Sequence, residues 1–198
     1  MATKADIIRE STLLFAENGF QATSIATISK AVNLSASAGG IYRHFKSKRD
    51  IFDAIFDSYY ENFGSLFNDI EFKIQDSAEA NKADVNKKDI VQGLIHMSLQ
   101  QAKSNKNTLK LYFREHDRIT PTHQKGAELV RNKSIKSFQS VCRYLTDGDS
   151  DFDSEAVAAI LIDSINFRVC EFSPDFGISE ERFIASLTDL LCALVICD

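Results

Sequence analysis

Residues 20–53 contain the feature that most restricts how this chain can fold. This stretch holds two short patterns of helical periodicity separated by a polar turn at Asn33, followed by an aromatic pair. It also holds four basic side chains, Arg43, Lys46, Lys48 and Arg49. Two short helices joined by a turn, with cations beside them, are the elements of a helix-turn-helix, whose second helix enters the major groove of DNA. The stretch therefore predicts three packed N-terminal helices and favours DNA binding.

The rest of the chain also carries helical periodicity. A first helix is predicted from Thr3 to residue 18. Two short helices are predicted from about Ser24 to Val32 and from Ser35 or Ser37 to about Phe45. We expect Leu34 to pack in the turn between them, and Ile41 and Phe45 to face the core. A long helix from Ser47 to about residue 70 has apolar residues on one face at every turn. Further helices are predicted at residues 89–104, 106–117, 121–146, 154–172 and 179–197, with a loop at residues 76–88. The expected fold class is all-α: an N-terminal three-helix helix-turn-helix domain followed by a C-terminal helical bundle.

The two helices predicted at residues 154–172 and 179–197 are apolar around more than half of their circumference. Ile160 and Phe167, for example, fall outside the main apolar stripe of the first helix. A helix that is apolar on two sides must be covered on two sides. We expect the second cover to be a partner chain, which would give a homodimer through a four-helix bundle. The alternative is that both helices are buried inside a monomer.

Charge is distributed unevenly along the chain. Residues 1–49 carry seven Lys or Arg and three Asp or Glu, a net charge of +4. The whole chain has a net charge of −5, so the remainder carries −9. A basic N-terminal segment on an acidic body favours local contact with phosphates and argues against indiscriminate binding of nucleic acid.

The segment at residues 7–52 resembles the N-terminal domain of TetR-family transcriptional repressors. The first helix ends in Asn-Gly-Phe at residues 18–20, and residues 23–28 are similar to the family's T-S/T-x-x-x-I segment. The strongest similarity is GIYRHFKSKRDI at residues 40–51, which resembles the family pattern L-Y-x-Y/H-F-x-S-K-E/D-x-L. This resemblance covers about a quarter of the chain, and the body shows no specific match.

The candidate DNA-binding residues are hydroxyl, basic and small residues of the helix-turn-helix. Hydroxyls and N–H groups where the second helix begins can hold a phosphate oxygen, and the cations can contact neighbouring phosphates. The resemblance implies that Thr23, Tyr42, His44 and Lys48 contact the DNA backbone. The full set of candidates is Thr23, Ser24, Ser35, Ser37, Ala38, Gly39, Tyr42, Arg43, His44, Lys46 and Lys48.

The turn before the recognition helix departs from the family pattern by two additional residues. Either Ser35 or Ser37 corresponds to the serine that opens this helix, and the sequence leaves the choice open. Residues 35–41 contain no Arg, Lys, Asn, Gln or acidic residue for bidentate pairing with a base edge. We therefore expect modest base discrimination, with the register set mainly by phosphates, DNA shape and half-site spacing.

The resemblance implies that residues 1–47 form the DNA-binding domain, and that residues 48–198 dimerise and hold a pocket for a small effector. The interior predicted for this body is rich in phenylalanine, at Phe56, Phe63, Phe67, Phe113, Phe138 and Phe167, which suggests a mostly apolar or aromatic effector. Polar candidates for the pocket wall are His96, Tyr112, Arg114, Asn166 and Arg168.

Other classes of function have less support in the sequence. The four histidines are scattered, and the chain has neither an HExxH motif nor a glycine-rich phosphate loop, so we expect no enzyme, cofactor or metal site. The apolar run at residues 183–197 is shorter than the roughly 20 residues of a membrane span, and we expect a cytoplasmic protein. The expected function is a homodimeric repressor of a palindromic operator, released by its effector. The alternatives are a helical protein-interaction adaptor with a basic head and an all-α enzyme.

Overall fold

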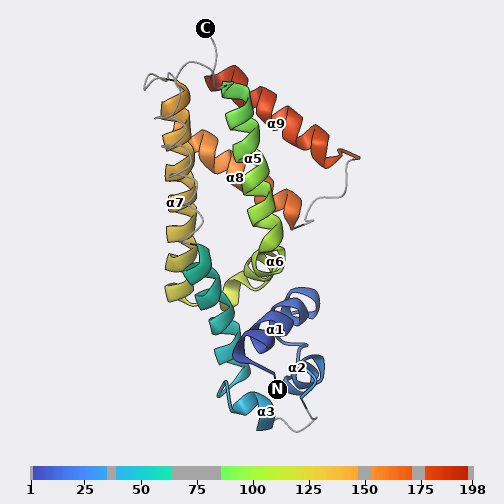
Figure 1. Ribbon diagram of the computed structural model, residues 1–198. Coiled ribbons are helices and arrows are strands. Elements are labelled where there is room, and N and C mark those ends of the chain that lie inside the picture. The colour runs from blue at the N-terminus through green and yellow to red at the C-terminus, as the bar shows by residue number, and fades with distance from the viewer. Residues whose placement is uncertain (1, 35–38, 64–85, 147–152, 171–176, 196–198) are drawn as a thin grey trace. The chain divides into compact units, whose positions relative to one another are not determined.

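The fold is helical throughout the part of the chain that a computed structural model describes, which comprises residues 2–34, 39–63, 86–146, 153–170 and 177–195 (Figure 1). No strand occurs in these ranges. The elements are α1 (Lys4–Asn18), α2 (Ile25–Ala31), α3 (Gly39–Tyr42), a helix over residues 48–63, α5 (Lys87–Ser104), α6 (Lys106–Arg114), the short 3₁₀ helix η1 (His116–Arg118), α7 (Pro121–Leu145), α8 (Ser154–Val169) and α9 (Glu180–Val195). The expected all-α fold class is confirmed.

The first helices begin at the capping residues that the sequence indicates. The Thr3 hydroxyl accepts the Asp6 N–H at 3.1 Å, and the Thr3 N–H donates to the Asp6 carboxylate at 3.0 Å. This main-chain hydrogen bond from Thr3 lowers the pKa of Asp6. Ser24 caps α2 by accepting the Thr27 N–H at 3.0 Å.

Three helices end earlier than predicted, and one of them is α8, which ends at Val169 instead of residue 172. α3 ends at Tyr42 instead of about Phe45, because the N–H groups of His44 and Phe45 both donate to the Ile41 carbonyl and close a turn. α6 ends at Arg114, and the chain continues as the 3₁₀ turn η1 where a single helix to residue 117 was expected. Helix ends are the least certain part of a periodicity argument, since several backbone groups there have no partner within the helix.

The chain divides into two compact units, and each is described by itself. Unit 1 comprises Met1–Asn62 and Asn105–Ala127, and unit 2 comprises Phe63–Ser104 and Glu128–Asp198. Unit 1 thus contains the N-terminal helices together with α6, η1 and the start of α7. Contacts therefore extend the N-terminal unit beyond residue 47, where the sequence analysis places the functional boundary.

Unit 1 has an aromatic core. The ring centroids of Phe15 and Phe20 are 5.4 Å apart, those of Phe20 and Phe52 are 5.1 Å apart, and those of Phe52 and Phe56 are 5.2 Å apart. The buried side chains of the whole cluster are Ile7, Phe15, Ala16, Ile28, Ile41, Phe45, Ile51, Phe52, Ile55, Phe56, Leu111 and Ile119. The inward orientation expected for Ile41 and Phe45 is confirmed, and α6 and the end of η1 contribute to the same core.

The start of α7 is fixed to the helix over residues 48–63 by polar contacts. The Tyr60 phenol donates to the His123 carbonyl at 2.7 Å, and burial raises the pKa of Tyr60, so the phenol stays protonated and can donate. The buried His123 ring lies 3.1 Å from the Asp57 carboxylate through its Nε2 atom. These contacts join the second range of unit 1 to the first.

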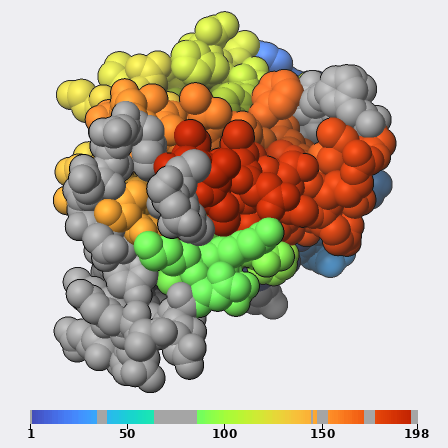
Figure 2. All heavy atoms as spheres, turned by 90° about the horizontal axis from the view of Figure 1, so that it is seen from above, coloured from blue at the N-terminus to red at the C-terminus, as the bar shows by residue number. Residues whose placement is uncertain are grey.

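Unit 2 is a helical bundle in which α5 packs against both α8 and α9. Figure 2 shows α9, in red, beside α5, in green. The buried core includes Ile95 and Leu99 of α5, Leu161 and Ile165 of α8, and Ile184 and Leu191 of α9. The ion pairs Lys88–Asp189 and Lys103–Glu180 also join α5 to α9, but exposed pairs contribute little to stability, so apolar packing holds this unit.

None of the described helices is long and apolar enough to cross a bilayer.

Candidate nucleic-acid interface

The turn between α2 and α3 has the backbone that a helix-turn-helix requires. Asn33 has a φ of 55°, in the left-handed region that asparagine adopts more readily than most residues. Leu34 follows it and packs against the core of unit 1, as predicted. A Cβ on Gly40 would lie only 3.0 Å from Leu34 Cδ1, so α3 approaches the turn this closely because residue 40 has no side chain.

The residues that open the recognition helix are only partly described. Gly39 is the first residue of α3. Ser35, Ser37 and Ala38 lie outside the described residues, and so does the choice between the two serines.

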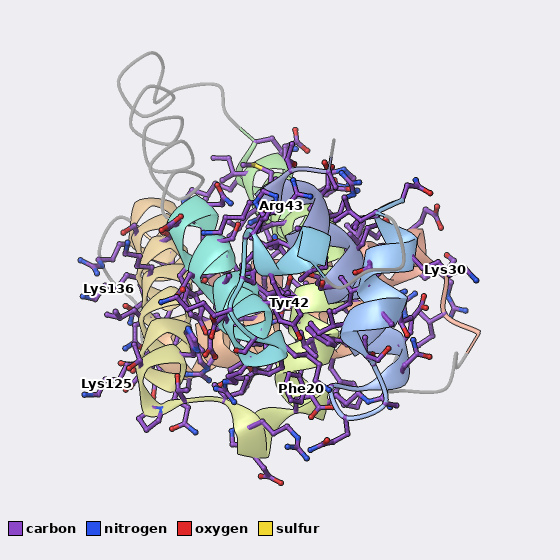
Figure 3. The ribbon with its side chains drawn as sticks, turned by 90° about the horizontal axis from the view of Figure 1, so that it is seen from below. Phe20, Lys30, Tyr42, Arg43, Lys125 and Lys136 are labelled. Carbon is purple, nitrogen blue, oxygen red and sulfur yellow. The ribbon has the colours of Figure 1, made fainter. Side chains whose placement is uncertain are left out.

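Four of the candidate DNA-binding residues lie together, exposed, at the end of α3 and just after it. Tyr42 is 52% exposed, and Arg43, His44 and Lys46 are also exposed. Tyr42 and Arg43 are labelled in Figure 3. Among the described residues, neither the Arg43 guanidinium nor the Lys46 ammonium has an ion-pair partner. A phenol, an imidazole and two uncompensated cations on one short segment can contact successive phosphates.

Two other candidates are engaged inside the protein. Thr23 is 2% exposed, and its hydroxyl donates to the carbonyls of Gly19 at 2.9 Å and Leu14 at 3.2 Å. The Lys48 ammonium donates to the carbonyls of Phe20 at 2.8 Å and Thr23 at 3.0 Å. Both side chains therefore fix the turn between α1 and α2, whereas the neighbouring Ser24 is exposed.

The structure adds two residues that the sequence analysis does not include among the candidates. Thr27 and Lys30 are exposed on α2, one and two turns after Ser24. The Thr27 hydroxyl lies 2.8 Å from the Ser24 hydroxyl, and Figure 3 shows Lys30 pointing outward from α2. The spacing of three residues from Ser24 is the signal in the sequence that could have identified them.

The five candidate effector-binding residues are divided between the two units. Tyr112 is half-buried in unit 1, with its ring 6.3 Å from that of Phe56, and Arg114 donates to the carbonyls at the end of α1. His96, Asn166 and Arg168 belong to unit 2, where His96 is exposed and Asn166 is half-buried. The Arg168 guanidinium donates to the Ile178 carbonyl at 2.6 Å and lies 4.8 Å from the centre of the Phe183 ring. Neither unit by itself brings the five residues together.

The phenylalanine-rich interior is confirmed only in part. Phe56, Phe63 and Phe138 are buried, but Phe113 is 46% exposed and Phe167 is 52% exposed. The expectation that Phe113 and Phe167 face the interior was wrong. Phe167 lies outside the main apolar stripe of its helix, and Phe113 and its neighbour Arg114 are both exposed on α6. Phe67 lies outside the described residues.

Among the residues that the structure describes, no group of three or more His, Cys, Asp or Glu side chains could hold a metal ion. Burial raises the pKa of the Cys142 thiol to about 11, as expected for a cysteine that serves as a small core residue.

The geometry of unit 1 defines a helix-turn-helix protein with an exposed polar and basic edge. Residues 7–55 match the family model of bacterial regulatory proteins of the tetR family, so the N-terminal resemblance is confirmed. The whole chain has the fold of TetR-family transcriptional regulators.

Solved structures support this fold over nearly the entire chain. A bacterial regulatory protein of the tetR family from Rhodococcus RHA1 has a TM-score of 0.71 and 23% identity, covering 98% of this chain and 97% of that one. Salmonella enterica GusR has a TM-score of 0.64 and 22% identity, covering 98% and 95%. The ketosteroid transcriptional regulator KstR2 of Mycobacterium tuberculosis has a TM-score of 0.67 and 18% identity, covering 98% and 93%. None of the curated proteins matches the sequence.

Proposed function

We propose that this protein is a transcriptional repressor that binds a palindromic operator as a homodimer. The observation that carries the proposal is the group of exposed residues Tyr42, Arg43, His44 and Lys46, which follows a helix-turn-helix in the segment that matches the tetR family. The basic N-terminal segment of an otherwise acidic chain supports the same function, since the acidic body disfavours binding to DNA elsewhere.

The proposed interface has contacting and positioning residues. The contacting residues are Ser24, Thr27 and Lys30 on α2, Ser35, Ser37, Ala38 and Gly39 around the start of α3, and Tyr42, Arg43, His44 and Lys46 after it. Thr23 and Lys48 serve the interface by holding the α1–α2 turn, because the Thr23 hydroxyl and the Lys48 ammonium donate to main-chain carbonyls. Phosphate contacts and half-site spacing set the register, with modest base discrimination.

We propose that the homodimer forms through α8 and α9. α8 buries Leu161 and Ile165 inside unit 2, yet Ile160 is 66% exposed and Phe167 is 52% exposed. α9 similarly exposes Leu190 at 58% and Leu194 at 41%. Large apolar side chains repeated on the open side of two neighbouring helices are typical of a surface that a second chain covers. Pairing of α8 and α9 with their copies would form a four-helix bundle.

We further propose that a small, mostly apolar or aromatic effector releases the operator. An effector can do so only if it binds the arrangement that does not bind DNA more tightly than the arrangement that does. Two supporting observations are the buried rings of Phe63 and Phe138 in unit 2 and the description of one structural neighbour as a ketosteroid transcriptional regulator. Arg114 and Arg168, which are bonded to main-chain carbonyls, contribute to this proposal less than His96, Tyr112 and Asn166.

The decisive experiment selects genomic fragments with the purified protein at physiological salt and sequences the bound DNA. A two-fold symmetric consensus, bound with an affinity that falls steeply as salt rises, is the expected result. Absence of any salt-dependent binding to duplex DNA would overturn the proposal and leave the protein-interaction adaptor as the better explanation of the basic N-terminal segment.

A further inference from the structure

The turn between α1 and α2 is held by residues that lie far along the chain in α6 and just after it. The Arg114 guanidinium donates from one nitrogen to the carbonyls of Ala16 at 3.1 Å and Glu17 at 2.8 Å. The Glu115 carboxylate accepts the Phe20 N–H at 3.0 Å. All five residues belong to unit 1. The last turn of α1 and the first residue after its glycine cap are therefore both bound by consecutive residues at the end of α6.

Arg114 supplies the cation that the C-terminal end of α1 lacks. The last carbonyls of a helix have no partner within the helix, and the negative end of the helix dipole favours a cation there. The last turn of α1 contains no basic residue. The guanidinium of Arg114 thus takes the position that a lysine or arginine of α1 itself would otherwise occupy.

The carboxylate of Glu115 is largely buried, and both of its oxygens have partners. Its side chain is 11% exposed, and the oxygen that does not accept from Phe20 lies 2.9 Å from the Arg118 guanidinium. A carboxylate this buried is stable only when both oxygens are paired. Glu115 therefore has little freedom to leave the turn.

Gly19 makes the close approach possible. Its φ of 87° and ψ of 158° lie in a region that is essentially restricted to glycine. A Cβ at this position would lie 3.2 Å from the Glu115 carboxylate and 3.3 Å from the Arg114 guanidinium. The Asn-Gly-Phe sequence at residues 18–20 thus both ends α1 and makes room for the end of α6.

Phe20 is bound on both sides by opposite charges. Its N–H donates to Glu115 at 3.0 Å, and its carbonyl accepts from Lys48 at 2.8 Å. One contact comes from the residue directly after α6 and the other from the helix over residues 48–63. The backbone that leads into Ser24 and α2 is consequently fixed by two elements outside α1 and α2.

We propose that Glu115 is a positioning residue for DNA binding, and that it acts by holding the Phe20 N–H and with it the α1–α2 turn. The working DNA-binding head then includes α6 and η1, and residues 1–47 alone do not hold the helix-turn-helix in its binding arrangement. This inference rests on the proposed DNA-binding function, and it adds a requirement to that function which neither the N-terminal motif nor the family match contains.

Charge and positioning predict opposite effects on DNA affinity when Glu115 is removed, so the proposal can be tested directly. Removing a carboxylate from a protein that binds a polyanion strengthens binding by general electrostatics. Loss of positioning weakens it. Asp117 is the matched control, because it is an acid two residues away whose side chain is fully exposed and makes no contact with the turn.

The experiment compares Glu115→Ala, Glu115→Gln and Asp117→Asn in the full-length protein. One measurement is hydrogen exchange of backbone amides in the free protein, and the other is affinity for the selected operator over a range of salt. Glu115→Gln keeps an oxygen that can accept the Phe20 N–H but loses the charge, so it should retain most of the contact that fixes the α1–α2 turn.

For Glu115→Ala we expect exchange of the Phe20 amide to accelerate about tenfold or more, while amides of the buried core keep their protection. We also expect the dissociation constant to rise about tenfold with an unchanged salt slope, because no phosphate contact is removed. Glu115→Gln should remain within about threefold of the wild type in both measurements. Asp117→Asn should bind as tightly as the wild type or more tightly.

Several results would overturn the inference. Unchanged exchange at Phe20 in Glu115→Ala would show that the carboxylate does not hold the turn, and affinity that rises as it does in Asp117→Asn would show that charge alone matters. Faster exchange throughout the core of Glu115→Ala would show a general loss of folding, and the Glu115→Gln variant would then decide. If Glu115→Gln keeps normal exchange protection in the core but binds the operator weakly, the hydrogen bond to Phe20 is rejected as the cause. If the wild type binds no duplex DNA, the proposed function itself fails, while the exchange of Phe20 still reports whether Glu115 holds the turn.

Discussion

The ammonium group of Lys48 lies 2.8 Å from the Phe20 carbonyl oxygen and 4.4 Å from the centre of the Phe20 ring. The same nitrogen lies 3.0 Å from the Thr23 carbonyl oxygen, so one side chain binds both ends of the α1–α2 turn. Charged hydrogen bonds to carbonyls and a cation over an aromatic face both stabilise a folded chain. Lys48 is therefore part of the internal structure of unit 1, whereas the nearby Lys46 is exposed.

This difference predicts distinct effects of two similar substitutions. Lys48→Met should lower the free energy of unfolding by about 1.5–3 kcal/mol, because hydrogen bonds from a charged group are lost. Lys46→Met should change it by less than about 0.5 kcal/mol, as is usual for a surface position. Urea denaturation followed by circular dichroism measures both. A Lys48→Met protein as stable as the wild type would show that the contacts with the turn contribute little.

Gly19 and Gly93 provide an opposed pair of substitutions to alanine. Gly19→Ala should destabilise the protein by about 1–3 kcal/mol, because its positive φ is unfavourable for alanine and the new Cβ meets Glu115 and Arg114. Gly93 lies inside α5, and a Cβ there meets nothing within 4 Å. Gly93→Ala should therefore stabilise by about 0.5–1 kcal/mol. The comparison is made by thermal and urea unfolding, and equal effects at the two sites would contradict the role of the Gly19 conformation.

The exposed group after α3 should act on DNA affinity without acting on stability. Arg43→Gln should weaken operator binding and reduce the slope of log affinity against log salt by about 1.8, as expected for the loss of one phosphate contact in each half of the dimer. Tyr42→Phe should weaken binding about three- to tenfold with an unchanged slope, because it removes a hydroxyl and no charge. Fluorescence anisotropy at several salt concentrations provides both values.

Lys136→Gln is the control for these two variants, since it removes an exposed cation of α7 that lies outside unit 1. It should leave the slope unchanged. A slope that falls equally in Lys136→Gln and Arg43→Gln would point to binding by net charge and would count against the assigned interface.

The helix-turn-helix could be predicted from the sequence because its information is local. Capping by Thr3 and Ser24, the turn at Asn33 and the inward side chains of Ile41 and Phe45 all depend on neighbours within a few residues. The starts of α7 and α8 agree with the predicted residues for the same reason. Local patterns decide where a helix lies and which of its faces is apolar.

The remaining assignments depended on partners that are distant in sequence. Arg114 looked like a polar residue of a pocket wall, yet its guanidinium binds the carbonyls of Ala16 and Glu17 at the end of α1. Glu115 carried no recognisable signal in the sequence, because the N–H group from which it accepts a hydrogen bond belongs to Phe20, 95 residues earlier in the chain. Which apolar face of a helix is covered inside the chain is likewise a tertiary property, as the exposure of Phe167 on α8 illustrates.

The proposed dimer predicts different outcomes for two equally exposed side chains. Ile160 on α8 is 66% exposed and Leu129 on α7 is 63% exposed. Ile160 shares its helix face with Phe167, seven residues later, whereas Leu129 lies among exposed polar residues such as Lys125 and Asn132. Only the first therefore shares its helix face with another large exposed apolar side chain.

Ile160→Glu should convert the dimer to a folded monomer, because the glutamate would place a charge in an interface that excludes water. Leu129→Glu should remain dimeric and equally helical. Light scattering after size-exclusion chromatography measures the mass, and circular dichroism measures the helix content. The Ile160→Glu monomer should also bind a single half-site and lose most of its affinity for the full palindrome, since both half-sites must be engaged together. A wild type that is monomeric at all concentrations, or an Ile160→Glu protein that stays dimeric while Leu129→Glu dissociates, would place the interface elsewhere on the chain.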